Sequence, residues 1–233
     1  MDSNSQKYDR LNVYLHTIVH ELRNPLVAIQ GFAGLLSDKF GENLTGEGSN
    51  YLKRILANLH RVEGLLSDIT KLATVTVEEK DFKLVPVREI IDAGLEAFDG
   101  HQRSGVLKVS IQPDLPAIYC DPRAVIQVFA NLLSNAIKYA RDHHECQVEI
   151  GYASNELFHK FYVKDNGVGI RLQDRHKVFR MFSRLQNKKN VSGSGLGLAI
   201  VKRIIEGHGG ETWVDSRLHQ GTAVYFTLPR RGA

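Results

Sequence analysis

Three residues in the short stretch VHELRNPLVAI could act together in chemistry. His20 and Glu21 are adjacent, and Asn24 follows one helical turn later. A neutral imidazole is a competent nucleophile, and a neighbouring carboxylate can hold its tautomer and accept its proton. Taken alone, the stretch also fits an ordinary solvated surface histidine. Pro25 removes a backbone hydrogen bond near Glu21, so we expect the helix to bend or loosen there, unless the proline is simply tolerated.

A second set of polar residues interrupts the apolar stretch NLLSNAIKY. On a helix, Asn131, Asn135, Lys138 and Tyr139 would lie on neighbouring turns of one side. An amide oxygen suits Mg²⁺, a lysine brings charge to a phosphate, and a tyrosine offers a ring edge and a hydroxyl to a nucleoside. The alternative is a polar outer face with paired amides.

Glycine turns provide the remaining candidate positions. In KDNGVGI, Asp165 ends a strand pattern and can accept from an exocyclic amine such as that of adenine, while Gly169 allows a backbone to approach a ligand closely. A DNG turn alone is also common in hairpins. In VSGSGLGLAIVKRII, Gly193, Gly195 and Gly197 precede and open a helix, whose unpaired N–H groups suit a phosphate. This loop lies too late in the chain for a dinucleotide-binding fold.

Two long amphipathic helices are expected to carry the histidine. Apolar residues recur at alternating steps of four and three over residues 11–36 and again over 52–73, which is a heptad pattern. Residues 38–50 between them hold glycines and capping side chains. Because a helical hairpin cannot bury such wide stripes alone, we expect two copies to form a four-helix bundle, and hence a homodimer. In this register His20 lies on the outer face.

Shorter patterns in the second part of the chain predict a separate domain. Strand patterns are VLKVSIQ, AIYC, CQVEIGYA, LFHKFYVKDNG, ETWVDS and TAVYFTL, interleaved with helices near residues 122–139, 172–179 and 196–206. Mixed strands with helices on one face indicate an α/β sandwich, which gives an α+β fold class overall. We predict a helical hairpin over residues 1–78 and the sandwich domain over 79–233.

The composition narrows the classes of function. Of the 233 residues, 42% are hydrophobic, and 30 Lys and Arg against 26 Asp and Glu give a net charge of +4 that is spread along the chain. This does not favour nucleic acid as a partner. No apolar run approaches the roughly 18–20 residues needed to span a bilayer, and no secretory core is present, so we expect no membrane insertion. Two cysteines fit a reducing, cytoplasmic setting and leave a single bridge open.

In chain order, the motifs HELRNP, NLLSNAIKY, DNGVGI, VFRMF and GSGLGLAI closely resemble those of the sensor histidine kinases of two-component signalling, whose ATP-binding domain is of the GHKL type. The resemblance extends roughly from Tyr8 to Pro229. Chaperones, topoisomerase subunits, mismatch-repair ATPases and serine kinases that regulate sigma factors share the nucleotide fold but lack a histidine-bearing hairpin. A dimeric scaffold without catalysis is a further alternative, which the intact motifs disfavour.

The resemblance implies a role for each motif. His20 would be the phosphoacceptor, with Glu21 as its base, and Asn24 would assist removal of phosphate from the partner regulator. Phe179 and Phe182 would anchor a lid over the nucleotide. The ATP pocket would be formed by Asn131, Asn135, Lys138, Tyr139, Asp165, Gly167, Gly169, Phe182, Gly193, Gly195, Leu196 and Gly197, with Asn135 as the Mg²⁺ ligand.

The implied activity is ATP-dependent autophosphorylation on His20, followed by transfer to an aspartate in the receiver domain of a response regulator. Phosphatase activity toward that regulator would accompany it. Since the heptad pattern begins almost at the first residue, we expect this chain to be the catalytic core of a longer protein whose sensory domain lies upstream and is absent from it.

Overall fold

The computed structural model describes residues 3–41, 46–74, 77–141, 145–183 and 194–230, without the side chains of residues 3–18, 20, 61 and 71–74. These residues form two compact units, a helical hairpin and an α/β unit. The hairpin ends at Thr74, and the first element of the α/β unit begins at Glu79. A domain boundary near residue 78 stays our proposal.

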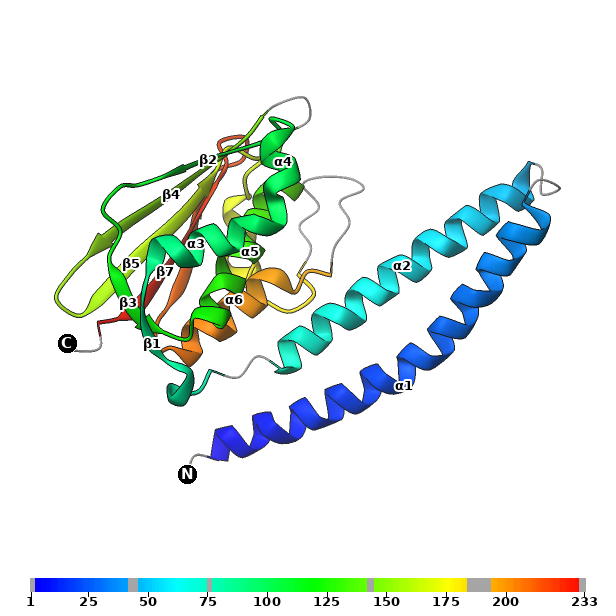
Figure 1. The fold of residues 1–233 in the computed structure, drawn as a ribbon, viewed down its shortest axis with the longest axis horizontal. Helices are drawn as coiled ribbons and strands as arrows, with labels where there is room; N and C mark the ends of the chain where they lie inside the picture. Colours follow the sequence, from blue (N-terminus) through cyan, green and yellow to red (C-terminus); the bar gives the residue numbers. More distant parts are fainter. Residues whose placement is uncertain (1–2, 42–45, 75–76, 142–144, 184–193, 231–233) are drawn as a thin grey trace. The chain divides into compact units, whose positions relative to one another are not determined.

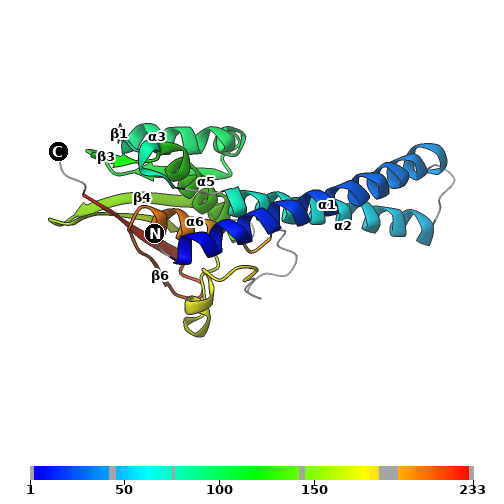
Figure 2. The same ribbon diagram turned by 90° about the horizontal axis from the view of Figure 1, so that it is seen from below.

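The hairpin consists of α1 (Ser3–Phe40) and α2 (Glu47–Thr74), which run side by side in both views (Figures 1 and 2). The α1 helix continues through Pro25, and its ribbon curves along its length (Figure 1). The two helices pack through a small cluster of buried side chains, formed by Ala33, Leu52 and Leu59 with Leu26 and Leu56 against it.

Much of the predicted heptad stripe is exposed on this hairpin. On α1 the exposed stripe residues are Leu22, Ile29, Phe32 and Leu36, and on α2 they are Ile55 and Val62. The α1 side chains that pack against α2 are instead Leu26 and Ala33. The apolar stripe of α1 is therefore wider than one helix contact, and only one edge of it is used within the hairpin.

The α/β unit contains every predicted strand. Its elements are η1 (Glu79–Asp81), β1 (Lys83–Pro86), α3 (Val87–Leu95), η2 (Glu96–Phe98), α4 (Asp99–Arg103), β2 (Leu107–Ile111), β3 (Ala117–Cys120), α5 (Pro122–Lys138), β4 (Cys146–Ser154), β5 (Phe158–Asp165), η3 (Leu172–Lys177), α6 (Gly197–Gly207), β6 (Thr212–Ser216) and β7 (Thr222–Pro229). The helix expected over residues 172–179 is a 3₁₀ helix that ends at Lys177.

The main sheet has five strands in the order β2-β4-β5-β7-β6. Strands β2 and β4 are parallel, and the other neighbours are antiparallel. Strands β1 and β3 form a separate antiparallel pair. Helices α3, α5 and α6 lie over one face of the main sheet (Figure 1). This arrangement confirms the predicted α/β sandwich with a mixed sheet and helices on one face.

The sandwich core lies between that sheet face and the helices. Phe129 of α5, Phe161 of β5 and Phe226 of β7 are at most 1% exposed. The Phe226 ring centroid lies 5.7 Å from that of Phe129 and 5.3 Å from that of Phe161. Because residues alternate along a strand, the neighbouring Tyr162 and Tyr225 lie on the opposite face of the sheet. The core is thus complete within one chain.

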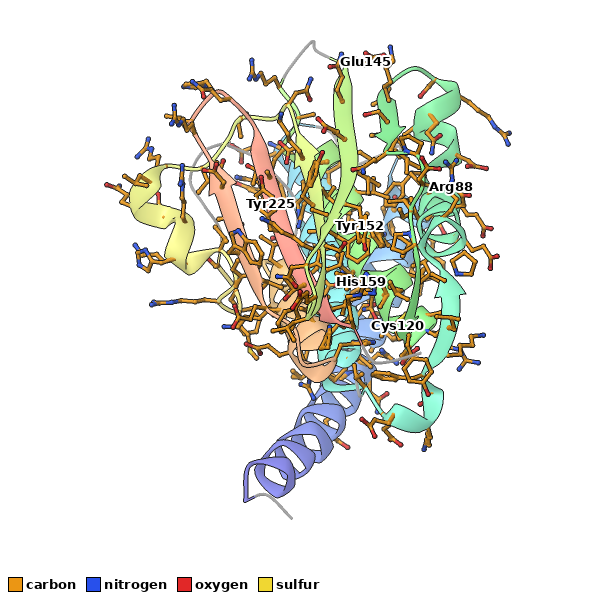
Figure 3. The ribbon with its side chains drawn as sticks, turned by 90° about the vertical axis from the view of Figure 1, so that its left-hand side faces the viewer. Arg88, Cys120, Glu145, Tyr152, His159 and Tyr225 are labelled. Carbon is orange, nitrogen blue, oxygen red and sulfur yellow. The ribbon has the colours of Figure 1, made fainter. Side chains whose placement is uncertain are left out.

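Buried histidines of this unit are held by neighbours. Tyr152 and His159, on adjacent strands, are labelled in Figure 3, and Tyr152 Oη lies 2.8 Å from His159 Nδ1. Burial, and then the charge of Arg230, lower the pKa of His159. His208 Nε2 accepts from the Asp121 N–H, so the ring proton is on Nδ1, which donates to a backbone carbonyl of α6. These contacts give both histidines a structural role.

Candidate functional site

Helix α5 forms one wall of the candidate site. It begins at Pro122, and the Asp121 carboxylate caps it by accepting from the backbone N–H groups of Arg123 and Ala124. One side of α5 is buried through residues such as Val128 and Leu132, which turns the polar residues of NLLSNAIKY toward another side. The predicted amide pair is therefore carried on a rigid, capped helix.

The side-chain amides of Asn131 and Asn135 meet the start of α6. A Cβ on Gly197 would lie 3.5 Å from Asn131 Oδ1 and 3.7 Å from Asn135 Nδ2. Asn131 Nδ2 is buried and has no hydrogen-bond partner among the described residues. The Asn135 amide likewise makes no hydrogen bond within the described part of the chain. Because buried amides are almost always paired, the unmet donor of Asn131 indicates a ligand or water beside it.

The amino end of α6 lies against these amides. Helix α6 begins at Gly197, and no side chain of the described residues caps it. The first N–H groups of a helix have no partner within the helix, and its dipole favours an anion there. Leu196 is fully buried, so its side chain anchors the loop in the core and only its backbone can reach a ligand.

The glycine loop also contacts the segment that carries Phe182. Gly195 has φ +75°, and a Cβ there would lie 2.8 Å from the Ser183 carbonyl oxygen. Only glycine fits this left-handed position against a neighbouring backbone. Phe182 itself is exposed and Phe179 is half-buried. The lid is predicted over residues 183–192, and all of it except Ser183 lies outside the described residues, as does Gly193.

Asp165 lies at the end of β5 and is held through one carboxylate oxygen. Oδ1 accepts from the backbone N–H of Gly167 at 2.8 Å and from that of Thr222 at 3.1 Å. Oδ2 accepts no hydrogen bond from the described residues. Burial raises the pKa of Asp165 to about 6, although both backbone hydrogen bonds act to lower it. The carboxylate therefore presents one fixed and one available acceptor.

The turn after Asp165 is packed against the end of α5. The Val168 N–H donates to the Tyr139 carbonyl oxygen at 3.0 Å. A Cβ on Gly167 would lie 2.6 Å from the same oxygen, so the turn has no room for a side chain there. Tyr139 follows Lys138, whose Nζ lies 5.8 Å from the Tyr139 ring centroid. Helix α5 thus contacts the α6 start through its amides and the Asp165 turn through its carboxyl end.

The turn between β6 and β7 supports the same region, and the sequence did not point to it. Gly169 has φ +71°, and a Cβ there would lie 2.0 Å from the Arg217 carbonyl oxygen. The Arg141 guanidinium donates to the carbonyl oxygens of Gly167 and His219. These contacts join residues far apart in the chain, so no local motif could reveal Arg141. Gly221, in the QGTAV stretch, was the one residue whose type could have indicated the β6–β7 turn.

The three candidate residues of the hairpin lie on α1. Glu21 and Asn24 are exposed, whereas the side chain of His20 lies outside the described residues. Helical spacing places His20 and Asn24 one turn apart, on the side of α1 opposite Leu22 and Ile29. These residues belong to the hairpin unit, whereas the candidate nucleotide-binding residues on α5, at the Asp165 turn and at the α6 start belong to the α/β unit.

The two cysteines are buried thiols whose raised pKa values do not suit them to nucleophilic chemistry. Cys120 and Cys146 are free and buried, and burial raises the pKa of the first thiol to about 12 and of the second to about 11. Thiols with raised pKa values are poor nucleophiles at neutral pH. The described residues contain no cluster of three or more metal-binding side chains. No described helix is both long and apolar enough to cross a membrane.

Two protein families match separate parts of the chain. Residues 11–76 match the "His Kinase A (phospho-acceptor) domain", and residues 120–232 match the "Histidine kinase-, DNA gyrase B-, and HSP90-like ATPase". The first match contains the HELRNP stretch, and the second contains the Asn131, Asp165 and glycine-loop motifs. The match over residues 11–76 disfavours ATPases that have only the nucleotide fold.

Similar proteins agree with this division. Cyanobacterial phytochrome B of Nostoc sp. is 33% identical over 94% of this chain, which covers 29% of that protein. The methanogenesis regulatory histidine kinase FilI of Methanothrix harundinacea is 36% identical over 93% of this chain, which covers 24% of that protein. The structure of full-length ShkA in complex with AMPPNP has a TM-score of 0.67 and 25% identity, over 94% of this chain and 46% of that one. The chain thus spans under a third of the length of the two curated relatives, the phytochrome and FilI.

Proposed function

This chain belongs to the sensor histidine kinases, with their phospho-acceptor and ATP-binding domains, and we propose that it transfers the γ-phosphoryl group of ATP to its own His20. The phosphoryl group then passes to an aspartate in the receiver domain of a response regulator. The observation that carries the nucleotide half of this proposal is Asn131 Nδ2, which is buried without a hydrogen-bond partner among the described residues, on a side chain that lies against the start of α6.

The arrangement along α5 fits a nucleoside triphosphate. Asn131 and Tyr139 are eight residues apart, which is about 12 Å along a helix axis. At the Tyr139 end, Asp165 Oδ2 is an acceptor for the exocyclic amine of adenine. At the Asn131 end, the N–H groups that open α6 provide positive charge for the phosphates. Lys138, next to Tyr139, is proposed to add its charge to the phosphates through its long side chain. The base and the phosphates are thereby assigned to opposite ends of one wall.

The same residues fit a magnesium ion. Asn135 and Asn131 offer amide oxygens, which are hard ligands of the kind that Mg²⁺ prefers, and the Asn135 amide is not used by other described residues. When bound there, Mg²⁺ would neutralise charge on the phosphate oxygens. Asn135 is the proposed direct ligand, and Asn131, whose Oδ1 lies against the α6 start and whose Nδ2 is buried, is proposed to lie beside the ion.

His20 is the proposed nucleophile. A ring nitrogen of neutral His20 forms a bond to the γ-phosphorus while the bond to the β–γ bridging oxygen breaks, so ADP leaves. Glu21, adjacent and exposed, accepts the proton that the imidazole loses. His20 lies opposite the apolar stripe of α1, where a second domain can approach it.

Incubation with γ-labelled ATP and Mg²⁺ tests the kinase activity. The label should be acid-labile and alkali-stable, as expected for a phosphohistidine, and His20→Gln should abolish it. His16→Gln, one turn earlier on α1, is the matched control and should keep the label. A label on a hydroxyl group, or ATP hydrolysis with no label on the protein, would contradict the proposal.

A homodimer is the proposed assembly. The exposed stripe of α1 and α2 offers apolar side chains such as Phe32, 69% exposed, and Ile29, 48% exposed. A second hairpin can cover them as a four-helix bundle, which would also complete the phospho-acceptor domain. The two buried free thiols agree with a reducing setting, and we propose a cytoplasmic location.

Asn24 is the proposed residue for the reverse reaction, the hydrolysis of the regulator's aspartyl phosphate. Its exposed amide lies one turn from His20 and could orient the attacking water, which requires only positioning. Asn24→Ala should leave autophosphorylation within about twofold and lower dephosphorylation by about tenfold or more. Gln30→Ala is the control on the same helix. If dephosphorylation by Asn24→Ala is unchanged, this role is wrong.

A further inference from the structure

Ser216, the last residue of β6, lies at a junction of buried hydrogen bonds. It is 4% exposed. Its Oγ accepts from the Ile170 N–H at 2.9 Å, donates to the Gly221 carbonyl oxygen at 2.7 Å and lies 2.9 Å from Thr222 Oγ1. A hydroxyl has one proton and two lone pairs. Since the Ser216 proton is used toward Gly221, Thr222 must donate its hydroxyl proton to Ser216.

This junction connects to both sides of the Asp165 turn. The Thr222 N–H donates to Asp165 Oδ1, the oxygen that fixes the carboxylate. Ile170 ends the DNGVGI stretch, so its hydrogen bond to Ser216 fixes the far side of the turn. Ser216 therefore lies one hydrogen bond from the turn itself and two from Asp165.

The backbone contacts around the junction leave little freedom for rearrangement. Gly221 has φ +85°, and a Cβ there would lie 1.9 Å from the Asp165 carbonyl oxygen. The His219 N–H donates to the Val168 carbonyl oxygen at 2.8 Å. The β6–β7 turn and the Asp165 turn are thus packed backbone to backbone, and the Ser216 hydroxyl, like the Arg141 guanidinium, bonds to both.

We propose that Ser216 is a positioning residue for recognition of the adenine amine. By holding Thr222 and Ile170, it keeps Asp165 Oδ1 engaged with the backbone and leaves Oδ2 directed to the ligand. It also fixes the proton direction, because a Thr222 hydroxyl that donates to Ser216 can only accept from any other group. A site that presents acceptors suits a 6-amino purine and disfavours a 6-oxo purine. This inference rests on the proposed role of Asp165 in binding the amine.

Initial rates of autophosphorylation, measured over a range of concentrations of two nucleotides, test the proposal, with kcat here the rate at saturating nucleotide and KM the concentration that gives half of it. Purine riboside triphosphate differs from ATP only in lacking the 6-amino group. Ser216→Ala should raise the KM for ATP by about tenfold, the scale of one lost hydrogen bond, and leave kcat within about twofold. The KM for purine riboside triphosphate should stay within about twofold. Ser216→Cys, which keeps the volume but bonds weakly, should behave like Ser216→Ala.

Two controls separate positioning from a general loss of structure. Thr212→Ala changes the same face of β6, four residues away, and should leave both KM values unchanged. In an Asp165→Asn background, Ser216→Ala should raise the KM for ATP by less than about twofold, because the acceptor it positions is already absent. The fluorescence of Trp213, the single tryptophan, reports whether each variant is folded.

The outcomes are distinguishable. An equal rise in KM for both nucleotides, or no rise for ATP, overturns the role of Ser216 while the role of Asp165 stands. If the wild-type protein fails to distinguish the two nucleotides, the proposed contact of Asp165 with the amine is itself wrong. A selective loss for ATP that disappears in the Asp165→Asn background supports the inference.

Discussion

The hairpin and the sandwich differ in how much of their apolar surface is buried within one chain. In the sandwich, Phe129, Phe161 and Phe226 are at most 1% exposed and pack on one another within a single chain. In the hairpin, Phe32 is 69% exposed and Ile29 is 48% exposed. Burial of apolar area is the main source of stability. The sandwich is therefore expected to be stable by itself, whereas the proposed homodimer would supply the hairpin with a second copy to cover its stripe.

The candidate chemistry follows the same division. In the sandwich, Asp165 is fixed by backbone groups from its own turn and from β7, and the Asn131 amide lies against the start of α6. In the hairpin, Glu21 and Asn24 project from one exposed helix face. A nucleotide site gains from fixed groups, because they reduce the cost of ordering on binding. A phosphoacceptor that must meet two different domains needs an accessible surface instead.

Removing a core ring should have the largest effect. Phe161→Ala leaves a cavity between α5 and the sheet, so the free energy of unfolding of the sandwich should fall by about 3–5 kcal/mol. Denaturant unfolding followed by Trp213 fluorescence measures this, because the single tryptophan lies on β6. The effect should not depend on protein concentration. Phe32→Ala, the matched change in the hairpin, should leave the Trp213 transition where it is.

Placing a charge in the exposed stripe should act through assembly. Phe32→Glu puts a carboxylate where a second hairpin would pack, and the dimer dissociation constant should rise by about 100-fold or more. Light scattering with size-exclusion chromatography over a range of concentrations measures it. Val27→Glu is the control, because Val27 is also exposed, at 57%, but lies on the opposite side of α1. A Phe32→Glu variant whose dimer dissociation constant equals that of the wild-type protein, or a wild-type protein that is monomeric throughout the range, would refute the assembly.

These two regions also differ in what the sequence could predict. Heptad spacing predicted both helices of the hairpin, because the 3.6-residue period is local. It did not predict that Leu26 and Ala33 pack on α2 while Leu22 and Ile29 stay exposed. A wide apolar stripe does not say which edge meets the partner within the chain and which meets another copy.

In the sandwich, alternation predicted the strands and motif spacing predicted the groups on α5, the Asp165 turn and the glycine start of α6. The contributions of Arg141, Ser216 and Thr222 were missed. Each acts by hydrogen bonds between segments distant in the chain, such as the bond from Arg141 to the Gly167 carbonyl oxygen. Register between strands, which decides such contacts, is not encoded in a local pattern.

A smaller effect is expected from adding a side chain where the β6–β7 turn packs against the Asp165 turn. Gly221→Ala would place a Cβ against the Asp165 carbonyl oxygen at a residue with φ +85°. The free energy of unfolding should fall by about 1–3 kcal/mol, and the affinity for ATP should fall with it. Gly100→Ala is the control, because Gly100 lies in α4 with open space around its Cβ position. Nucleotide titration and Trp213 unfolding should both leave Gly100→Ala near the wild-type protein.

The smallest effect is a pH dependence that has opposite signs with and without nucleotide. Burial raises the pKa of Asp165 from 3.8 to about 6. Without nucleotide, the folded state binds this proton more readily than the unfolded state does, so this group adds stability as the pH falls from about 6 toward 3.8. The adenine amine instead needs the ionised carboxylate. At pH 5 about a tenth of Asp165 is ionised, so the affinity for ATP should fall by up to about tenfold relative to pH 7.

Two comparisons isolate Asp165 from other groups that titrate in this range. The phosphates titrate alike in ATP and in purine riboside triphosphate, so the ratio of the two affinities should change with the pKa of Asp165 alone. His159 has a lowered pKa, so its protonation destabilises the fold as the pH falls, against the trend from Asp165. The difference in unfolding free energy between the wild-type protein and Asp165→Asn removes that contribution. If the ratio of the affinities for ATP and purine riboside triphosphate does not change between pH 5 and 7, the Asp165 carboxylate does not accept from the adenine amine. The backbone groups that fix Asp165 would then position it for another contact.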